Sequence, residues 1–229
     1  MMKTSVKYVL SGVFMALFLL LIVLTKWVDV DSIGPNGTKV GFAGLNGAVA
    51  KSLVYNKTWY QITELLGYAA LGCAGIFAVI GLIQLVQRHS LFKVDMNLLL
   101  AGGLYLIVIS LYVFFNKVAV NYRPVLIPGE KELEASFPSS HTMLSCVVFG
   151  SAFLLIPRYI RTDGLKWILF TILALAMMLT VVGRILAGVH WLTDIFGGVL
   201  ISVSLLMLFS GLLDRFGTTL KNEGDIVEM

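Results

Sequence analysis

The sequence predicts an all-α membrane protein built as a bundle of six transmembrane helices. The chain of 229 residues is 58% hydrophobic and only 13% charged, which is too apolar for a soluble domain of this size. Apolar runs of about 20 residues recur along it, and that length is needed to cross roughly 30 Å of hydrocarbon. We therefore interpret residues 1–229 as a single membrane domain.

The positions of the apolar runs give the expected spans. These cover about residues 8–27, 59–86, 96–115, 141–156, 167–184 and 193–213. The first run is too long for the apolar core of a typical signal peptide and is followed by Asp29 and Asp31 rather than small residues, so we expect a retained span. Between the first two spans, Leu45, Val49 and Leu53 have nearly helical spacing. They suggest a short interfacial helix, and a plain loop is the equal alternative.

The distribution of basic residues predicts the orientation. Six spans place both termini on one side, together with Lys3, Lys7, Arg88 and Arg158. By the positive-inside rule this side is cytoplasmic, which predicts a multi-pass plasma-membrane protein. The net charge of +4 calls for no nucleic-acid partner, since most Lys and Arg lie between the apolar runs, and no protein partner is predicted. The two cysteines lie inside apolar runs, which favours buried thiols over a disulfide framework.

Polar residues suited to phosphate chemistry occur in the connections on the opposite side. They are Arg123 after the third span, Ser139, Ser140 and His141 before the fourth, and Arg184, His190 and Asp194 around the fifth-to-sixth connection. Each has an ordinary explanation when taken alone, such as a helix cap or a positive flank. Their joint occurrence at one face of the membrane predicts a functional site, which would face outward in this topology.

The residue types in this set favour phosphoryl chemistry. Guanidinium groups match phosphate oxygens in pairs, and the N–H groups of a helix start attract anions. His190 and Asp194 are four residues apart, so in a helix they would share a face and the carboxylate would hold one ring nitrogen. Such an imidazole is a nucleophile or a base. His141, with an ordinary pKa of about 6.5, could protonate a leaving oxygen.

These residues resemble the signature motifs of a known family. Arg123-Pro124, Pro138-Ser139-Ser140-His141 and Gly183-Arg184 with His190 and Asp194 are similar to the three motifs of the type-2 phosphatidic acid phosphatase superfamily. Those motifs read Lys-x6-Arg-Pro, Pro-Ser-Gly-His and Ser-Arg-x5-His-x3-Asp. The resemblance covers about residues 116–194, and the third motif keeps its Arg, His and Asp spacing in full.

The chain departs from the family pattern at three positions. Lys117 lies six residues before Arg123 instead of seven, and Asn116 takes the motif position. One residue is about 100° of helical rotation, so either Lys117 or Asn116 could face the phosphate. Ser140 replaces the motif glycine, which keeps the capping chemistry but adds a side chain. Gly183 replaces the motif serine, which removes one hydroxyl contact.

The resemblance implies a lipid phosphate phosphatase without a metal or other cofactor. His190 would attack phosphorus to form a phosphohistidine, Asp194 would orient it, and His141 would protonate the leaving group. The phosphate would be bound by Arg123, Arg184 and Ser139, with Ser140 and Lys117 as further candidates. The expected substrate is a lipid phosphate or diphosphate at the outer leaflet, with undecaprenyl diphosphate slightly favoured over phosphatidylglycerol phosphate.

Three points stay open from the sequence. A lipid phosphotransferase would use the same intermediate and pass the phosphoryl group to an alcohol. A non-catalytic protein that binds or transports lipid phosphates is the second alternative. Glu64 in the second span is either interfacial or functional, and Trp59 and Tyr60 one turn earlier resemble an aromatic belt, which favours the interfacial reading.

Overall fold

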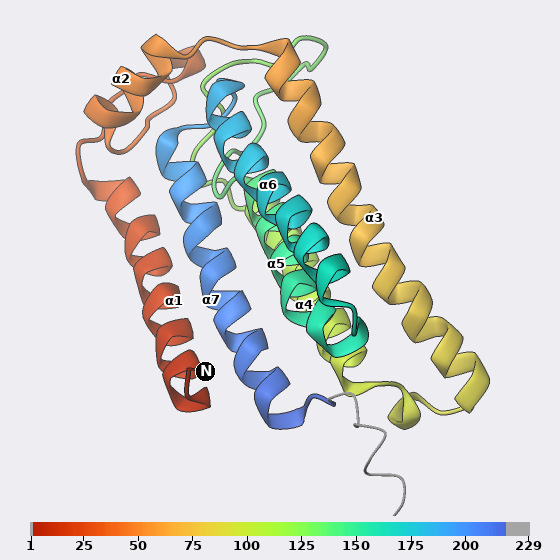
Figure 1. Ribbon diagram of the computed structural model, residues 1–229. Coiled ribbons are helices and arrows are strands. Elements are labelled where there is room, and N and C mark those ends of the chain that lie inside the picture. The colour runs from red at the N-terminus through yellow and green to blue at the C-terminus, as the bar shows by residue number, and fades with distance from the viewer. Residues whose placement is uncertain (1, 219–229) are drawn as a thin grey trace, which may run out of the picture.

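The computed structural model describes residues 2–218, and within this range the regular secondary structure is all helical, without strands (Figure 1). Seven α-helices and two short 3-10 turns follow one another along the chain. The helices are α1 Thr4–Trp27, α2 Ala43–Ser52, α3 Lys57–Arg88, α4 Met96–Lys117, α5 Ser140–Tyr159, α6 Asp163–Leu186 and α7 Leu192–Phe216, and the turns are η1 Pro35–Gly37 and η2 Leu91–Lys93.

Six of the helices, all except α2, are long and apolar enough to cross a membrane, which confirms the predicted spans. Most of them extend a few residues beyond the predicted bounds. For example, α3 continues to Arg88, α5 runs through Pro157 to Tyr159, and α6 starts at Asp163. Hydropathy marks only the part of a helix that lies in hydrocarbon, and continued helical hydrogen bonding satisfies the backbone beyond it.

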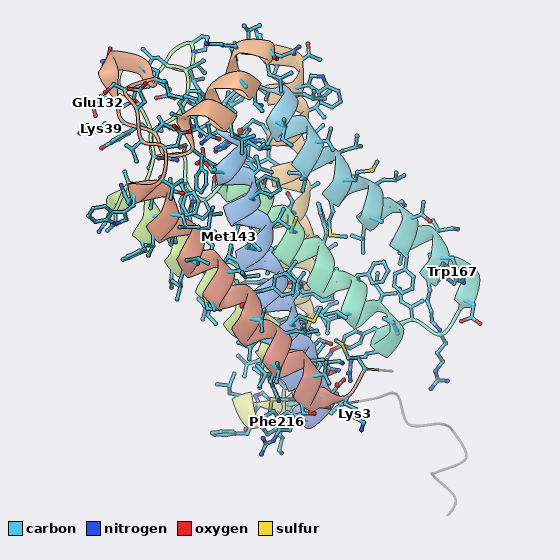
Figure 2. The ribbon with its side chains drawn as sticks, turned by 90° about the vertical axis from the view of Figure 1, so that its left-hand side faces the viewer. Lys3, Lys39, Glu132, Met143, Trp167 and Phe216 are labelled. Atoms are coloured by element: carbon cyan, nitrogen blue, oxygen red, sulfur yellow. The ribbon has the colours of Figure 1, made fainter. Side chains whose placement is uncertain are left out.

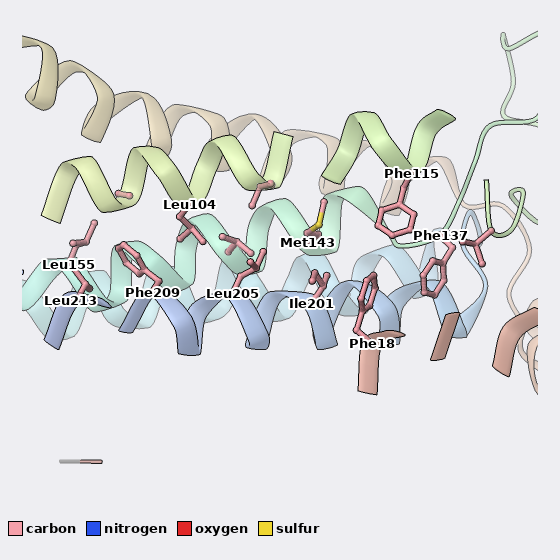
Figure 3. Close-up of a cluster of buried hydrophobic side chains, with 14 residues drawn as sticks. Phe18, Leu104, Phe115, Phe137, Met143, Leu155, Ile201, Leu205, Phe209 and Leu213 are labelled. Atoms are coloured by element: carbon pink, nitrogen blue, oxygen red, sulfur yellow. The ribbon is translucent and has the colours of Figure 1, made fainter. Parts of the chain in front are cut away.

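Helices α5 and α7 form the centre of the bundle. In each, 56% of the apolar window is buried, compared with 6% in α3 at the edge. Helix α1 packs along α7, and α5 packs against α3, α6 and α7 (Figure 1). Figure 3 shows the main apolar cluster between α4, α5 and α7, with Phe18 of α1 and Phe137 of the α4–α5 loop stacked at one end. This core anchors the loop just ahead of α5.

The segment predicted as a short helix or a loop is a helix. It is α2, Ala43–Ser52, and it lies across one end of the bundle (Figure 1). Its Asn46 is fully buried and exchanges hydrogen bonds with Thr193: Asn46 Nδ2 donates to Thr193 Oγ1 at 3.0 Å, and Thr193 N donates to Asn46 Oδ1 at 3.3 Å. Helix α2 is thereby fixed to the start of α7.

The bundle has two chemically different ends. We call the end with Lys3 and Phe216 the termini end, and the end with α2 and the α4–α5 loop (residues 118–139) the loop end (Figure 2). Figure 2 shows Lys39 and Glu132 at the loop end, opposite Lys3 and Phe216. The start of α1 and the end of α7 lie together, as six crossings require.

Candidate active site

The α4–α5 loop folds back on itself and brings Arg123 beside the start of α5. Tyr122 and Ala135 form an isolated antiparallel bridge. Next to it, Arg123 N donates to the Glu134 carbonyl at 3.1 Å, and Ser136 N donates to the Asn121 carbonyl at 2.9 Å. The first two predicted motifs, far apart in sequence, are therefore neighbours.

Ser139 is the N-cap of α5, as its residue type predicted. The Thr142 N–H donates to Ser139 Oγ at 3.5 Å, and the Ser139 N–H donates to the Asp194 carbonyl at 2.9 Å. Ser139 is fully buried, and through these two hydrogen bonds it links the start of α5 to the start of α7. Ser140 and His141 follow in the first helical turn.

Arg184 lies in the last turn of α6 and is fully buried. Its NH1 donates to Thr63 Oγ1 and to Glu64 Oε1, both at 3.2 Å, and its guanidinium lies 5.3 Å from the Tyr60 ring centroid. The preceding Gly183 explains the close approach, since a Cβ there would lie 2.6 Å from Thr63 Cγ2. The residue that replaces the motif serine is thus the one that lets α6 pack onto α3.

His190 lies in the connection before α7, not on the helix. Helix α6 ends at Leu186, Gly188 adopts the left-handed conformation with φ +66°, and α7 starts only at Leu192. The helix in which His190 and Asp194 would share a face is therefore not formed at His190. The two are still close, with 3.7 Å between His190 Nδ1 and Asp194 Oδ2.

The nearest partner of His190 Nδ1 is a backbone carbonyl. Nδ1 lies 3.1 Å from the Ser136 oxygen, where it donates as N–H, and Nε2 lies 3.3 Å from Arg184 NH2, from which it accepts. This pairing fixes the tautomer with the lone pair on Nε2. Burial, together with the positive charges of Arg123 and Arg184, holds the pKa of His190 well below its ordinary value. The ring is therefore neutral at neutral pH.

Asp194 is fully buried and is engaged mainly in fixing the α6–α7 connection. Its Oδ2 accepts from the Trp191 N–H at 2.9 Å, and its Oδ1 accepts from Asn121 Nδ2 at 3.3 Å. The carboxylate thus joins the first turn of α7 to the α4–α5 loop. It supports the position of the neighbouring His190 ring.

His141 packs against α3, where the Nε2 atom of its ring contacts the carboxylate of Glu64. His141 Nε2 is 3.1 Å from Glu64 Oε1. Three residues later on α3, a Cβ at Gly67 would lie 2.9 Å from His141 Cδ2, so the glycine provides the space for the ring. The structure therefore favours the functional reading of Glu64 that the sequence left open, and its carboxylate joins Arg184 to His141.

A polar cavity of about 190 Å³ opens beside these groups. Its lining includes Arg123, Ser140 and His141 as well as Glu64 and Glu134. Arg184 and His190 lie behind this lining, with 0% and 7% of their surfaces exposed. The cavity adjoins an apolar groove of about 310 Å³ between α3, α4 and α5, and the two share Glu64 and His141. We call these the polar cavity and the apolar groove.

Several buried donors around the polar cavity have no hydrogen-bond partner among the described residues. They are Nε and NH1 of Arg123, Nε of Arg184 and Nδ1 of His141. Buried polar groups are normally paired, so unpaired guanidinium N–H groups in one place mark a site prepared for an anion.

Lys117 is not brought into the polar cavity. It is exposed in the last turn of α4 and lines a neighbouring depression over the α4–α5 loop. Asn116, which has the motif position, lines the polar cavity as well as that depression. Of the two residues that the sequence left open, Asn116 and not the candidate ligand Lys117 therefore faces the polar cavity.

Sequence reasoning did not identify Glu64, Glu134, Asn121 or Ser136 as members of the site. Glu64 had a signal, because a carboxylate within a span is rare and is usually functional. The others act through loop contacts that depend on tertiary structure. Within residues 2–218, no group of three or more His, Cys, Asp or Glu side chains could hold a metal ion.

Comparisons with known proteins identify relatives of the chain. The chain is similar to phosphatidylglycerophosphatase B of Bacillus subtilis (strain 168), with 30% identity over 115 residues, 48% of this chain and 57% of that protein. The chain therefore matches less than two thirds of that relative's length.

The fold is also similar to a crystal structure described as the first transmembrane PAP2 type phosphatidylglycerolphosphate phosphatase from Bacillus subtilis. The TM-score is 0.58 and the identity 21%, covering 90% of this chain and 96% of that one. A family model described as the PAP2 superfamily matches residues 97–217, which is more than half of the chain and includes every motif of the site. With its six apolar helices the chain is a multi-pass membrane protein, and it is a member of the PAP2 superfamily.

Proposed function

We propose that the protein is a lipid phosphate phosphatase that works through a phosphohistidine intermediate. The observation that carries this proposal is the convergence of two buried arginines with unpaired N–H groups and two imidazoles beside one cavity. Arginine donors bind the charge on a transferring phosphoryl group, and paired imidazoles supply a nucleophile and an acid.

The first step transfers the phosphoryl group to His190. The Nε2 lone pair forms a bond to phosphorus as the bond to the leaving oxygen breaks, and His141 gives its proton to that oxygen. The Nδ1–H bond to the Ser136 carbonyl keeps the reactive tautomer, and Asp194 compensates the positive charge that the ring acquires. Arg123 and Arg184 bind the non-bridging oxygens, with the α5 start and its Ser139 cap behind them.

The second step returns His190 to its resting form. His141, now neutral, takes a proton from water, whose oxygen attacks phosphorus as the phosphorus–nitrogen bond breaks. Inorganic phosphate leaves, and both imidazoles regain their starting protonation. The step needs no metal, because the arginines supply the charge that a metal would otherwise supply.

The apolar groove supports a lipid substrate. It is lined by Tyr68, Leu71 and Ile109, which are 66%, 54% and 56% exposed on helices long enough to span the membrane. Such side chains face lipid, so a tail lying along them would place its headgroup at Glu64 and His141. We place the site at the outer leaflet by the positive-inside rule. Three of the basic residues on the loop side, Lys117, Arg123 and Arg184, lie in or beside the site, and the termini side keeps Lys3, Lys7, Arg88, Lys93, Arg158, Arg161, Lys166 and Arg215.

Phosphatidylglycerol phosphate is the first candidate substrate, because the relative from Bacillus subtilis carries the name phosphatidylglycerophosphatase B. Undecaprenyl diphosphate is the second, since an outward-facing site suits recycling of that carrier. Both lipids present a terminal phosphoryl group, and the arginines and imidazoles of the site would act on that group in either lipid.

The test is phosphate release by purified protein in detergent, with a chelator present, from both lipids and from phosphatidic acid. Release by wild type and none by the His190→Ala variant is the expected result, and the ranking names the substrate class. A second arm adds a lipid alcohol acceptor, and transfer to it in place of release would make the protein a phosphotransferase. No release and no transfer, with the protein folded, would contradict the proposal and favour a binding or transport protein.

A further inference from the structure

The carboxylate of Glu64 occupies a position that the proposed chemistry assigns to a substrate oxygen. A single oxygen, Oε1, accepts from Arg184 NH1 at 3.2 Å and lies 3.1 Å from His141 Nε2. The proposed mechanism needs both donors elsewhere, with Arg184 on a phosphate oxygen and His141 on the leaving oxygen. Glu64 comes from α3, outside all three sequence motifs.

A second carboxylate lies on the other arginine. Glu134 Oε2 is 2.8 Å from Arg123 NH2, and it comes from the α4–α5 loop. Glu64 and Glu134 both line the polar cavity. Each phosphate-binding arginine therefore carries one glutamate on one nitrogen, while Nε of both and NH1 of Arg123 have no partner among the described residues.

We propose that Glu64 and Glu134 are placeholder carboxylates, which neutralise the empty phosphate site and are displaced by the phosphoryl group of the substrate. This inference rests on the proposed function, because it assigns the same arginines to phosphate. It goes beyond that function because it predicts that two acidic side chains, which line the phosphate site, weaken the binding of anions to that site.

Two properties of Glu64 and Glu134 fit displacement better than a fixed structural role. Their side chains are 27% and 45% exposed, whereas Arg184 and Arg123 are 0% and 9% exposed at the side chain. A carboxylate at the rim of the cavity can move into solvent, and the buried guanidinium cannot. Each glutamate also contacts its arginine through a single guanidinium nitrogen, rather than through a bidentate fork.

Electrostatics requires the displacement. A phosphoryl dianion beside Arg184 would lie within a few ångströms of the Glu64 carboxylate, and like charges brought together in a buried site repel strongly. Without the glutamates, two buried guanidinium groups would stay uncompensated whenever the site is empty, which is costly. The placeholder carboxylates thus stabilise the empty protein and reduce its affinity for phosphate.

The test is direct binding of orthovanadate and of inorganic phosphate to detergent-purified protein by titration calorimetry. The variants are Glu64→Gln, Glu134→Gln and the double variant, with Glu132→Gln as the matched control. Glu132 is an exposed carboxylate on the same loop and lies outside the polar cavity. Apparent melting temperatures check that each variant is folded.

The expected result is tighter binding after removal of either charge. Glu64→Gln should lower the dissociation constant by roughly tenfold and Glu134→Gln by roughly threefold, because the first carboxylate is more deeply buried. The double variant should combine both effects, and Glu132→Gln should bind like wild type. If Glu64→Gln fails to fold, Glu134→Gln and its control still decide the question.

The inference is overturned if both variants bind the anions with unchanged or weaker affinity. A reduced kcat in Glu64→Gln without tighter anion binding would make Glu64 a positioning residue for His141 instead. Phosphate release from lipid by wild type, measured beside the binding, separates the two proposals. If wild type releases phosphate but the variants bind anions as wild type does, only the placeholder role is ruled out. If wild type shows no phosphate release and no anion binding, the phosphatase assignment is ruled out as well.

Discussion

Both ends of the bundle contain buried or half-buried charged residues, but the two ends differ in whether the polar atoms of these residues have hydrogen-bond partners. At the termini end, Lys7 Nζ lies 2.7 Å from Asp214 Oδ2, and Tyr159 Oη donates to Asp95 Oδ2 at 2.7 Å. None of these four residues has a buried side-chain atom without a partner. At the loop end, Arg123, Arg184 and His141 keep unpaired buried nitrogens.

This difference separates polar groups that hold helices from polar groups that await a ligand. A fully paired cluster has no free hydrogen-bond donor or acceptor for a ligand, and its removal lowers the stability of the protein. An incompletely paired cluster costs stability as it stands, and that cost is recovered when an anion binds. The comparison therefore predicts that substitutions at the loop end change activity, and that substitutions at the termini end change stability.

The largest effect is expected for His190→Ala. Loss of the nucleophile should reduce kcat/KM by roughly 10³-fold or more, because the arginines alone cannot form the covalent intermediate. The apparent melting temperature should stay within a few degrees of wild type, since the substitution removes two hydrogen-bond contacts, with Ser136 and Arg184, each contributing about 1 kcal/mol. Phosphate release and thermal unfolding on the same preparation provide the check, and substantial residual turnover would remove His190 as the nucleophile.

The pH dependence of kcat/KM tests the charge environment of the loop end. Burial and the neighbouring arginines hold the pKa of His190 well below about 6.5, so the neutral nucleophile should persist into acid, and activity should fall about tenfold per pH unit only below that lowered pKa. Arg123→Gln removes one neighbouring positive charge. It should therefore raise the pKa of His190 toward 6.5 and shift the acid side of the pH profile to higher pH. Use of one substrate for both proteins cancels the titration of the substrate. An unshifted acid side of the profile would show that Arg123 does not act on His190.

These two predictions concern residues that the sequence had already marked, and the reason is physical. Span length and hydropathy follow from the thickness of the membrane, so the six helices could be read from the apolar runs. His141, Arg184 and His190 stood out because they occur together in connections on one side of the membrane and at the spacing of known motifs, although each alone is an ordinary residue at a span end.

The rest of the site could not be read because it depends on tertiary contacts. His190 and Asp194 share no helical face because Gly188 turns the chain after α6, and His190 lies in the connection before α7 starts at Leu192. The Ser136 carbonyl reaches His190 only through the folded α4–α5 loop. Glu64 meets His141 because Gly67 and Gly183 let α3 approach both α5 and α6, and no local pattern encodes such an approach.

At the termini end, Asp214→Asn should lower stability and leave the chemistry intact. Lys7 is 8% exposed and would lose its carboxylate partner, while Thr4 Oγ1 would keep a weaker acceptor. We expect a loss of about 2–4 °C in apparent melting temperature, the change that about 1 kcal/mol produces in a protein of this size. The kcat should stay within about twofold. A large loss of kcat at unchanged stability would contradict the division between the two ends.

The smallest effect is expected at Lys117, at the margin of the loop end. Lys117→Ala should reduce kcat/KM by no more than about threefold, because an exposed cation outside the polar cavity acts only through screened, long-range attraction. Arg184→Ala, which removes a fully buried donor from the site, should cost about 100-fold. Equal losses in the two variants would show that Lys117 reaches the phosphate in spite of its register. A salt titration sharpens the result, since only a screened contribution of Lys117 should disappear at high ionic strength.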